Sequence, residues 1–209
     1  MNRFGTFSDF EAYVADRLVK DLPGRTAHGR MAAPHYKGWP QPQEKSRWSA
    51  VLILFYPQYD EIVFPVIQRP TYDGVHSGQI AFPGGKMDET DQDLHQTALR
   101  EAWEEIGVPK EEVKILGQLS EIYILVSDMR VVPVVGTVPA RPRFVPDARE
   151  VQEIREIGLS GIRDRQIIRE GKIPVRGGFV KSPYYDYDGL QIWGATAMMI
   201  SELLEIIEG

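Results

Sequence analysis

The sequence predicts an α/β protein in which helices cover both faces of a mixed sheet. Apolar segments of strand length alternate with segments of helical period, without the regular strand–helix–strand rhythm of an all-parallel sheet. A length of 209 residues suits one domain with terminal extensions better than two domains. We therefore expect an N-terminal helix and extended arm over residues 1–47 and one folded domain over residues 48–209.

The N-terminal region predicts a short helix followed by an arm. Ser8 and Glu11 have the spacing of a capping box, with a hydroxyl at the cap and an acidic residue three positions later. Apolar residues then recur at helical spacing until Pro23 and Gly24. Residues 25–45 are rich in Gly, Pro and His and show no period, which indicates a surface connection or an arm packed on the domain.

The central region predicts most of the sheet. Its strand candidates are short, apolar and bounded by turn residues, and they lie at 49–55, 61–69, 79–82, 113–124 and 129–138. Pro65 predicts an edge position for the second of these strands, because proline cannot donate to a ladder. We expect a loop over 69–78 and a tight turn at Pro83-Gly84-Gly85.

One long helix is predicted in this region, and further elements follow it. It runs from about Asp91 to Ile106 and ends at Gly107. After a polar loop, residues 151–164 predict strand, turn and short helix, and residues 175–189 predict a hairpin. The last element we expect is a helix over 195–208.

Composition and charge exclude several classes of function. The chain has no cysteine, so disulfides, thiolate metal sites and a cysteine nucleophile are excluded, and a reducing cytoplasm is the expected location. A net charge of -6 argues against a nucleic-acid partner. The apolar runs are too short to span a bilayer and the start lacks a signal-peptide layout, so we expect no membrane partner.

The strongest chemical signal is a group of three carboxylates on the long helix. At about 100° per residue, Glu105 lies about 40° from Glu101, and Glu104 lies about 60° away on the other side. Like charges at these spacings destabilise a helix, so a hard divalent cation such as Mg²⁺ is the expected compensation. The alternative is a solvated acidic face. An apolar stripe on the same helix weakens this alternative, since it fixes the helix on the core.

The segment from Gly85 to Val108 resembles the Nudix box. In that box Gly, five residues, Glu and seven residues precede Arg-Glu-apolar-x-Glu-Glu-x-Gly-apolar. Residues 100–108 match every named position of the second half. The first half departs from the box, because Asp91 stands six positions after Gly85 and the interval to Arg100 is one residue longer. Counted back from Arg100, the early acidic position falls on Gln92.

The longer interval is similar to that of the coenzyme A diphosphatases within the family. The run His76 to Gly85, with Arg69 seven residues before His76, resembles the upstream signature of that group. Residues 192–197, Ile-Trp-Gly-Ala-Thr-Ala, resemble its C-terminal pattern. Gly74 departs from the signature, which has Arg at this place. The resemblance covers roughly residues 48–209.

This resemblance implies a Nudix-type α/β/α sandwich with a mixed central sheet. It implies metal-dependent hydrolysis of coenzyme A or acyl-coenzyme A to 3',5'-ADP and (acyl-)4'-phosphopantetheine. Glu101, Glu104 and Glu105 would hold Mg²⁺ or Mn²⁺, with the carbonyl of Gly84 as a further ligand. We expect Arg100 to brace the turn through Asp88 or Asp91. The residues implied for substrate binding are Arg69, His76, Gly84 and Gly85.

Some roles stay open at the level of the sequence. Glu150 and Glu153 are both candidates for the general base, and both could equally be exposed strand positions. Trp193 could stack on adenine, but a core position is expected for a Trp in an apolar run. His76 could contact a phosphate or be an ordinary polar loop residue. The basic residues that could reach a substrate phosphate from the arm are Lys37, Lys45 and Arg47.

Two competing functions follow from the same sequence. One is a Nudix hydrolase of ADP-ribose or another nucleoside diphosphate. The other is a binding module that kept the fold and lost catalysis, against which the presence of Glu101 and Glu105 argues. In either enzyme the partner is a small-molecule nucleoside diphosphate. The sequence leaves the oligomeric state open, with a homodimer among the expectations.

Overall fold

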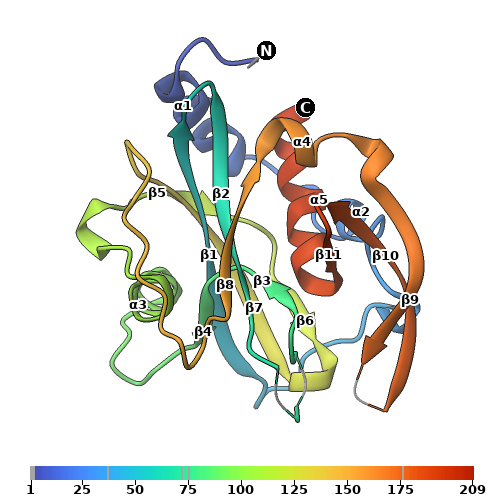
Figure 1. Ribbon diagram of the computed structural model, residues 1–209. Helices are drawn as coiled ribbons and strands as arrows, with labels where there is room; N and C mark the ends of the chain where they lie inside the picture. Colours follow the sequence, from blue (N-terminus) through green and yellow to red (C-terminus); the bar gives the residue numbers. More distant parts are fainter. Residues whose placement is uncertain (1–2, 37, 72, 75, 176) are drawn as a thin grey trace.

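The structure is a computed structural model, and it describes residues 3–36, 38–71, 73–74, 76–175 and 177–209. Its central feature is a mixed sheet that separates two sets of helices (Figure 1). Strands β1 (Arg47–Gln58) and β7 (Met129–Thr137) lie side by side and parallel at its middle. The other ladders of this sheet are antiparallel. The predicted mixed sheet with helices on both faces is therefore confirmed.

The remaining strands of this sheet extend it on both sides of the central pair. They are β2 (Glu61–Gln68), β3 (Ile80–Ala81), β4 (Gly84–Lys86), β5 (Lys114–Gln118), β6 (Ile122–Ile124) and β8 (Glu153–Gly158). The predicted single strand over 113–124 is two strands, β5 and β6, which both pair with β7. The predicted tight turn at Pro83-Gly84-Gly85 is wrong in part, because Gly84 and Gly85 belong to β4 and pair with β1.

The prediction of an edge position for the strand of Pro65 is wrong. Strand β2 pairs with β8 along one side and with β1 and then β3 along the other. The ladder to β1 ends at Val63 and the ladder to β3 begins at Ile67. Pro65 thus lies opposite a gap in the pairing on that side, which is how an interior strand accommodates it.

Two helical layers cover the sheet. Helix α3 (Leu94–Ile106) packs on one face, and α5 (Gly194–Glu208) covers the other together with α1 (Phe7–Leu18) and α2 (Arg25–His28) (Figure 1). The alternation along β1 explains the two cores: Leu52 and Leu54 face α3, whereas Ile53 and Phe55 face α5. The short helical turns are η1 (Pro34–Tyr36), η2 (Lys110–Glu112), η3 (Leu125–Ser127), α4 (Leu159–Ile162) and η4 (Arg165–Ile167).

A small antiparallel sheet lies beyond α5. It consists of β9 (Ile168–Val175), β10 (Gly178–Tyr187) and β11 (Leu190–Trp193). The hairpin predicted over 175–189 is mostly the single strand β10, which pairs with β9 and with β11. The predicted strand, turn and short helix over 151–164 are present as β8 and α4.

The N-terminal helix is present, but its cap differs from the predicted one. Thr6 caps α1, and its hydroxyl and the carboxylate of Asp9 form the reciprocal capping box. The predicted cap at Ser8 is therefore wrong by two positions. The arm after the helix packs on the domain, because Met31 and Tyr36 are buried in the core beneath α5. Across the residues that the structure describes, none of the helices combines the length and the hydropathy of a membrane-spanning segment.

Candidate active site

A cavity of about 900 Å³ opens on the α5 face of the sheet. Its walls come from the β1–β4–β7 part of the main sheet, the loop before β3, the start of α5, the β9–β10 hairpin and the arm. One end is polar and charged, and its side chains include Arg69, Glu101, Glu105 and Glu150. The structure thus brings together residues that are up to 81 positions apart in the sequence.

Helix α3 carries the carboxylates, and both of its ends are fixed. Asp93 is its N-cap and accepts a hydrogen bond from the backbone N–H of Gln96 at 2.8 Å. The helix begins at Leu94, so the predicted start at Asp91 is three residues early. Gly107 adopts the left-handed conformation with φ of 74° and ends the helix as predicted.

Glu105 is the most buried of these carboxylates. Its side chain is 1% exposed, and its Oε2 accepts a hydrogen bond from the N–H of Gly84 at 2.8 Å. The guanidinium of Arg69 lies 3.8 Å from Oε1. Burial raises the pKa of Glu105 to about 7, although Arg69 and the Gly84 N–H lower it, and the neighbouring Glu101 and Glu150 raise it further.

Glu101 lies next to Glu105 and meets the backbone of β4. Burial also raises the pKa of Glu101, partly offset by a hydrogen bond from Arg100 to Oε1 at 2.8 Å. Any side chain at Gly85 would collide with the Glu101 carboxylate, and one at Gly84 would collide with the Ala50 carbonyl of β1. Glycine is therefore required at Gly84 by close approach of the β1 backbone, whereas a side chain at Gly85 would displace the Glu101 carboxylate.

Arg100 binds the turn that precedes the helix. Its Nε and Nη2 donate to the two oxygens of Asp91 at 3.0 and 2.9 Å, and Nη2 also donates to the carbonyl of Lys86. Of the two positions left open by the sequence, Asp91 rather than Gln92 meets Arg100. The Arg100 hydrogen bonds lower the pKa of Asp91 to about 2. The guanidinium is saturated by these contacts and by those to Glu101 and Glu104.

Glu104 is separated from the other two carboxylates of the helix. Its side chain is 52% exposed and accepts a hydrogen bond from Arg100 at 3.0 Å. It does not belong to the described lining of the cavity. The 60° that separates it from Glu101 on the helix turns it toward solvent, whereas the 40° of Glu105 turns that residue under β4.

Glu150 enters the cavity from the loop between β7 and β8. The loop is held by the C-terminal end of α3, where Val145 and Asp147 donate their N–H groups to the carbonyls of Ile106 and Glu105 at 2.9 and 3.0 Å. These carbonyls have no partner within the helix. Glu153, the other candidate base, lies on β8 and pairs with Arg155 at 3.8 Å. Of the two, Glu150 lines the cavity and acts on the pKa of both Glu101 and Glu105.

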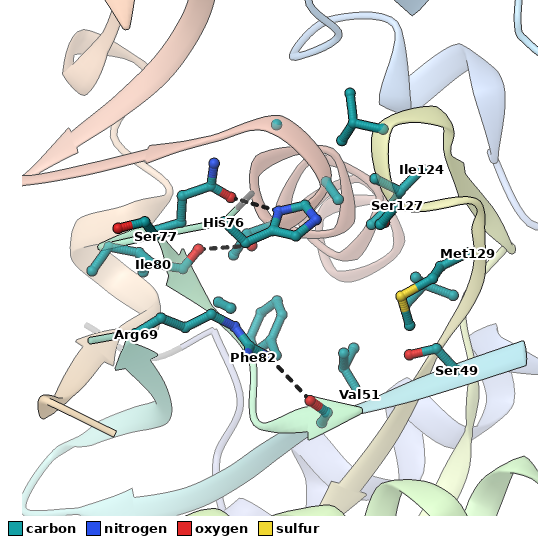
Figure 2. Close-up of a pocket in the computed structure, with 18 of the residues that line it drawn as sticks. Ser49, Val51, Arg69, His76, Ser77, Ile80, Phe82, Ile124, Ser127 and Met129 are labelled. Carbon is teal, nitrogen blue, oxygen red and sulfur yellow. Dashed lines mark hydrogen bonds between the residues drawn. The ribbon is translucent and has the colours of Figure 1, made fainter. Parts of the chain in front are cut away.

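The predicted substrate-binding residues line the same cavity (Figure 2). Arg69 reaches across the cavity and donates to the carbonyl of Gly84 at 3.2 Å. His76 has a positive φ of 68°, and its Nδ1 lies 2.9 Å from the Oε1 of Gln79. Gly74, where the resemblance to the coenzyme A diphosphatases leads us to expect Arg, also lines the cavity.

Trp193 corrects one expectation. It was expected in the core, but it is half-buried and lines the cavity at the start of α5. From the arm, His35 and Tyr36 contribute to the opposite wall, with ring centroids 4.7 Å apart, and sequence reasoning did not single them out. Proximity of the arm to the cavity arises only in the folded chain, and no local motif signals it.

The basic residues proposed from the arm lie differently. Arg47 donates to the carbonyl of Ser127 at 2.7 Å, and Lys45 is exposed. Lys37 lies outside the described residues. Neither Lys45 nor Arg47 belongs to the described lining of the cavity.

The charged end of the cavity fits a hard divalent cation. Its donors are carboxylate oxygens, and the charges of Glu101 and Glu150 raise the pKa of Glu105, a repulsion that a bound cation would relieve. Among the described residues, no three carboxylate or imidazole groups stand in a coordinating arrangement. Glu101 would therefore exchange its contact with Arg100, and Glu105 its contact with Gly84, for an ion.

The mixed sheet between helical layers places carboxylates of one helix at the charged end of a cavity, and comparison with known proteins gives the family. The model of the NUDIX domain matches residues 45–169, which is more than half of the chain. The chain therefore belongs to the Nudix family.

Curated relatives agree with this assignment. A protein of Pectobacterium atrosepticum named "Uncharacterized Nudix hydrolase NudL" is 38% identical over 130 residues, which are 61% of this chain and 66% of that protein. A protein of the same name from Yersinia enterocolitica is 39% identical over 132 residues, 62% of this chain and 66% of that protein. The match thus spans just under two thirds of these relatives.

A solved structure agrees at the level of the fold alone. The MutT protein from Methanosarcina mazei Go1 is 16% identical, with a TM-score of 0.52, over 78% of this chain and 96% of that one. Confirmation of the Nudix fold therefore extends beyond the residues matched by the family model.

Proposed function

We propose that this chain hydrolyses the diphosphate bond of coenzyme A or an acyl derivative. The products are 3',5'-ADP and 4'-phosphopantetheine or its acyl form. The observation that carries the proposal is the convergence of Glu101, Glu105 and Glu150 on one end of a cavity that Arg69 also lines. The cation is Mg²⁺ or Mn²⁺, held by Glu101 and Glu105. When bound, it supplies charge neutralisation of the diphosphate and a water of lowered pKa.

The side chains around this end have distinct tasks in the proposed reaction. Glu150 removes the proton of the attacking water, since its charge acts on Glu101 and Glu105 and it has no ion-pair partner among the described contacts that would hold it elsewhere. Arg69 releases the Gly84 carbonyl and binds a phosphate oxygen. Arg100 keeps Glu101 and the turn at Asp91 in place. Glu104 contributes to the charge balance of Arg100 rather than to the cavity.

Coenzyme A is favoured as substrate by two separated segments. The longer interval between Gly85 and Arg100 and the run that contains His76 resemble the coenzyme A group, and so does the segment around Trp193. In the structure the run that contains His76 and the segment around Trp193 line the same cavity. Gly74 removes one cation expected at a phosphate, which lowers affinity without changing the reaction.

The test is a side-by-side comparison of kcat/KM for coenzyme A, dephospho-coenzyme A and ADP-ribose, with Mg²⁺ or Mn²⁺ and products identified by mass. We expect coenzyme A to be cleaved most efficiently. A tenfold preference for ADP-ribose would instead support the second candidate, an ADP-ribose hydrolase. Absence of turnover with any diphosphate would support the third candidate, a binding module without catalysis.

A further inference from the structure

The end of the cavity opposite the carboxylates is apolar. One of its surfaces is formed by side chains of β1, β7 and β6. Odd-numbered residues of β1 and β7 face α5, and the parallel register places Ser49 beside Val131 and Val51 beside Pro133. Strand β6 continues the same face, with Ile124 beside Met129. We call Val51, Val131, Met129 and Ile124 the apolar strip.

The apolar strip begins at the charged end of the cavity. Val51 pairs with Gly84, whose N–H binds Glu105 and whose carbonyl binds Arg69. Figure 2 shows Val51 beside the hydrogen bond that Arg69 donates to the Gly84 carbonyl, with Met129 and Ile124 farther along the cavity. From Pro133 to Met129 is four residues of β7, which is about 13 Å at 3.3 Å per residue.

The wall that faces the apolar strip is apolar as well. It is formed by Met199 of α5, Val180 of β10, and Pro174 and Val175 of β9. The cavity therefore continues as a channel with apolar walls from its charged end toward the turn η3. Apolar concave surfaces of this kind are typical of ligand sites.

Two features at the far end of the channel have no role in the function proposed so far. Leu125 and Val126 of η3 are 51% and 63% exposed, and Val126 belongs to the described lining of the cavity, with Leu125 next to it in the chain. We call these two residues the lip. Beside them, the hydroxyl of Ser127 is buried and forms no hydrogen bond within the described part of the chain. A buried hydroxyl without a partner is unfavourable, so a ligand acceptor at this place would stabilise it.

We infer that the lip binds the acyl chain of a coenzyme A thioester and that Ser127 donates to the thioester carbonyl. This inference rests on the proposed function. A pantetheine arm of about 13 bonds spans about 15 Å when extended, so it covers the apolar strip and brings its sulfur to the row of Met129 and Ile124. The atoms beyond the sulfur then lie at Ser127 and on the lip. The enzyme therefore prefers thioesters with longer chains over free coenzyme A.

The test measures kcat/KM for coenzyme A, acetyl-coenzyme A and octanoyl-coenzyme A with Mg²⁺. Each fully buried methylene raises affinity about fourfold, but the lip is half-exposed and buries the chain only in part. We therefore expect kcat/KM for octanoyl-coenzyme A to exceed that for acetyl-coenzyme A by about tenfold. Val126→Ser should reduce this ratio to about threefold or less. The matched control is Val19→Ser, because Val19 is an exposed valine at the end of α1 and should leave the ratio unchanged.

A second variant tests the thioester contact. Ser127→Ala should lower kcat/KM for acetyl-coenzyme A about fivefold more than for coenzyme A, which has no carbonyl beyond its sulfur. Equal kcat/KM for all three compounds, or an unchanged ratio in Val126→Ser, would overturn the inference while the proposed function stands. If none of the three is cleaved and ADP-ribose is, the proposed function itself fails, and the assignment of the lip fails with it.

Discussion

At the scale of single residues, the buried carboxyl group of Glu105 has a shifted pKa, and this shift makes the free energy of unfolding depend on pH. The folded protein holds its pKa at about 7, whereas an unfolded Glu titrates near 4.3. Between these pH values the folded protein binds a proton that the unfolded chain does not bind. The free energy of unfolding contributed by this group therefore falls as pH rises from about 4.3 to about 7 and is constant above that.

We expect this effect in the metal-free protein, in the presence of a chelator. The wild-type protein should lose about 3 kcal/mol of stability through this group between pH 4.5 and pH 8, and Glu105→Gln should remove that loss. Urea unfolding of both proteins across this range measures the difference. Parallel curves for the two proteins would show that Glu105 is ionised at all these pH values and that its burial has little effect on its pKa.

Arg100 gives a second prediction at this scale. Lysine keeps the charge but cannot donate to both oxygens of Asp91 and to the Lys86 carbonyl at once. Arg100→Lys should lower the free energy of unfolding by about 1–3 kcal/mol and reduce activity, because Glu101 also loses its brace. Urea unfolding and turnover are measured together. Arg149→Lys is the control, since its pair with Asp147 is exposed. Unchanged stability with lost activity would indicate a direct contact with substrate.

Residue-level prediction from the sequence succeeded where one helix determines the geometry. The angles between Glu101, Glu104 and Glu105 follow from the helical period alone. The sequence nevertheless groups Glu104 with the other two as a metal ligand, whereas its side chain is exposed and lies outside the described lining of the cavity. Glu150 and Trp193 needed the folded chain. Nothing local to these two residues indicates that a loop and a helix start meet at one cavity.

At the scale of elements, the end of α3 positions the loop that carries Glu150. The carbonyls of Glu105 and Ile106 accept hydrogen bonds from that loop. A Cβ at Gly107 would lie 2.9 Å from the Cβ of Val145 in the same loop. Glu105, whose side chain lies at the charged end of the cavity, thus also holds the loop of Glu150 through its backbone carbonyl.

Gly107→Ala tests this coupling. Alanine at φ of 74° costs about 1–3 kcal/mol and displaces Val145, so we expect kcat to fall about tenfold or more with KM little changed. Gly189→Ala is the matched control, since Gly189 has φ of 77° but a Cβ there meets nothing within 4 Å. It should cost similar stability with kcat retained. If both variants lose kcat equally, the loop does not position the base.

Elements were predictable where the spacing of apolar residues and the turn or cap residues at the ends indicate the same element, as for β1, β7, α3 and α5. The misplaced elements depend on long-range pairing. Strand β4 is three residues with two glycines, and only its ladder to β1 makes it a strand. The interior position of Pro65 depends on β8, which lies some 90 residues later in the chain.

At the scale of the whole molecule, the chain outside the family match completes the cavity. The arm is anchored by a buried pair in which His28 Nε2 lies 2.8 Å from the carboxylate of Glu202 on α5. That carboxylate also accepts from Gly24 and Ser120, and although burial raises its pKa, these hydrogen bonds and that of His28 lower it below the ordinary value. One buried network thereby ties the arm, the sheet and α5 around the cavity.

The central claim is that the charged end of this cavity is a metal-dependent diphosphatase site. The most direct measurement is turnover of coenzyme A by Glu105→Gln with Mg²⁺, compared with wild type, after circular dichroism has shown that the variant is folded. We predict a loss of about three orders of magnitude in kcat, because the amide removes a charged ligand without changing shape. Near-normal turnover by the folded variant would contradict the assignment of Glu105 as a metal ligand.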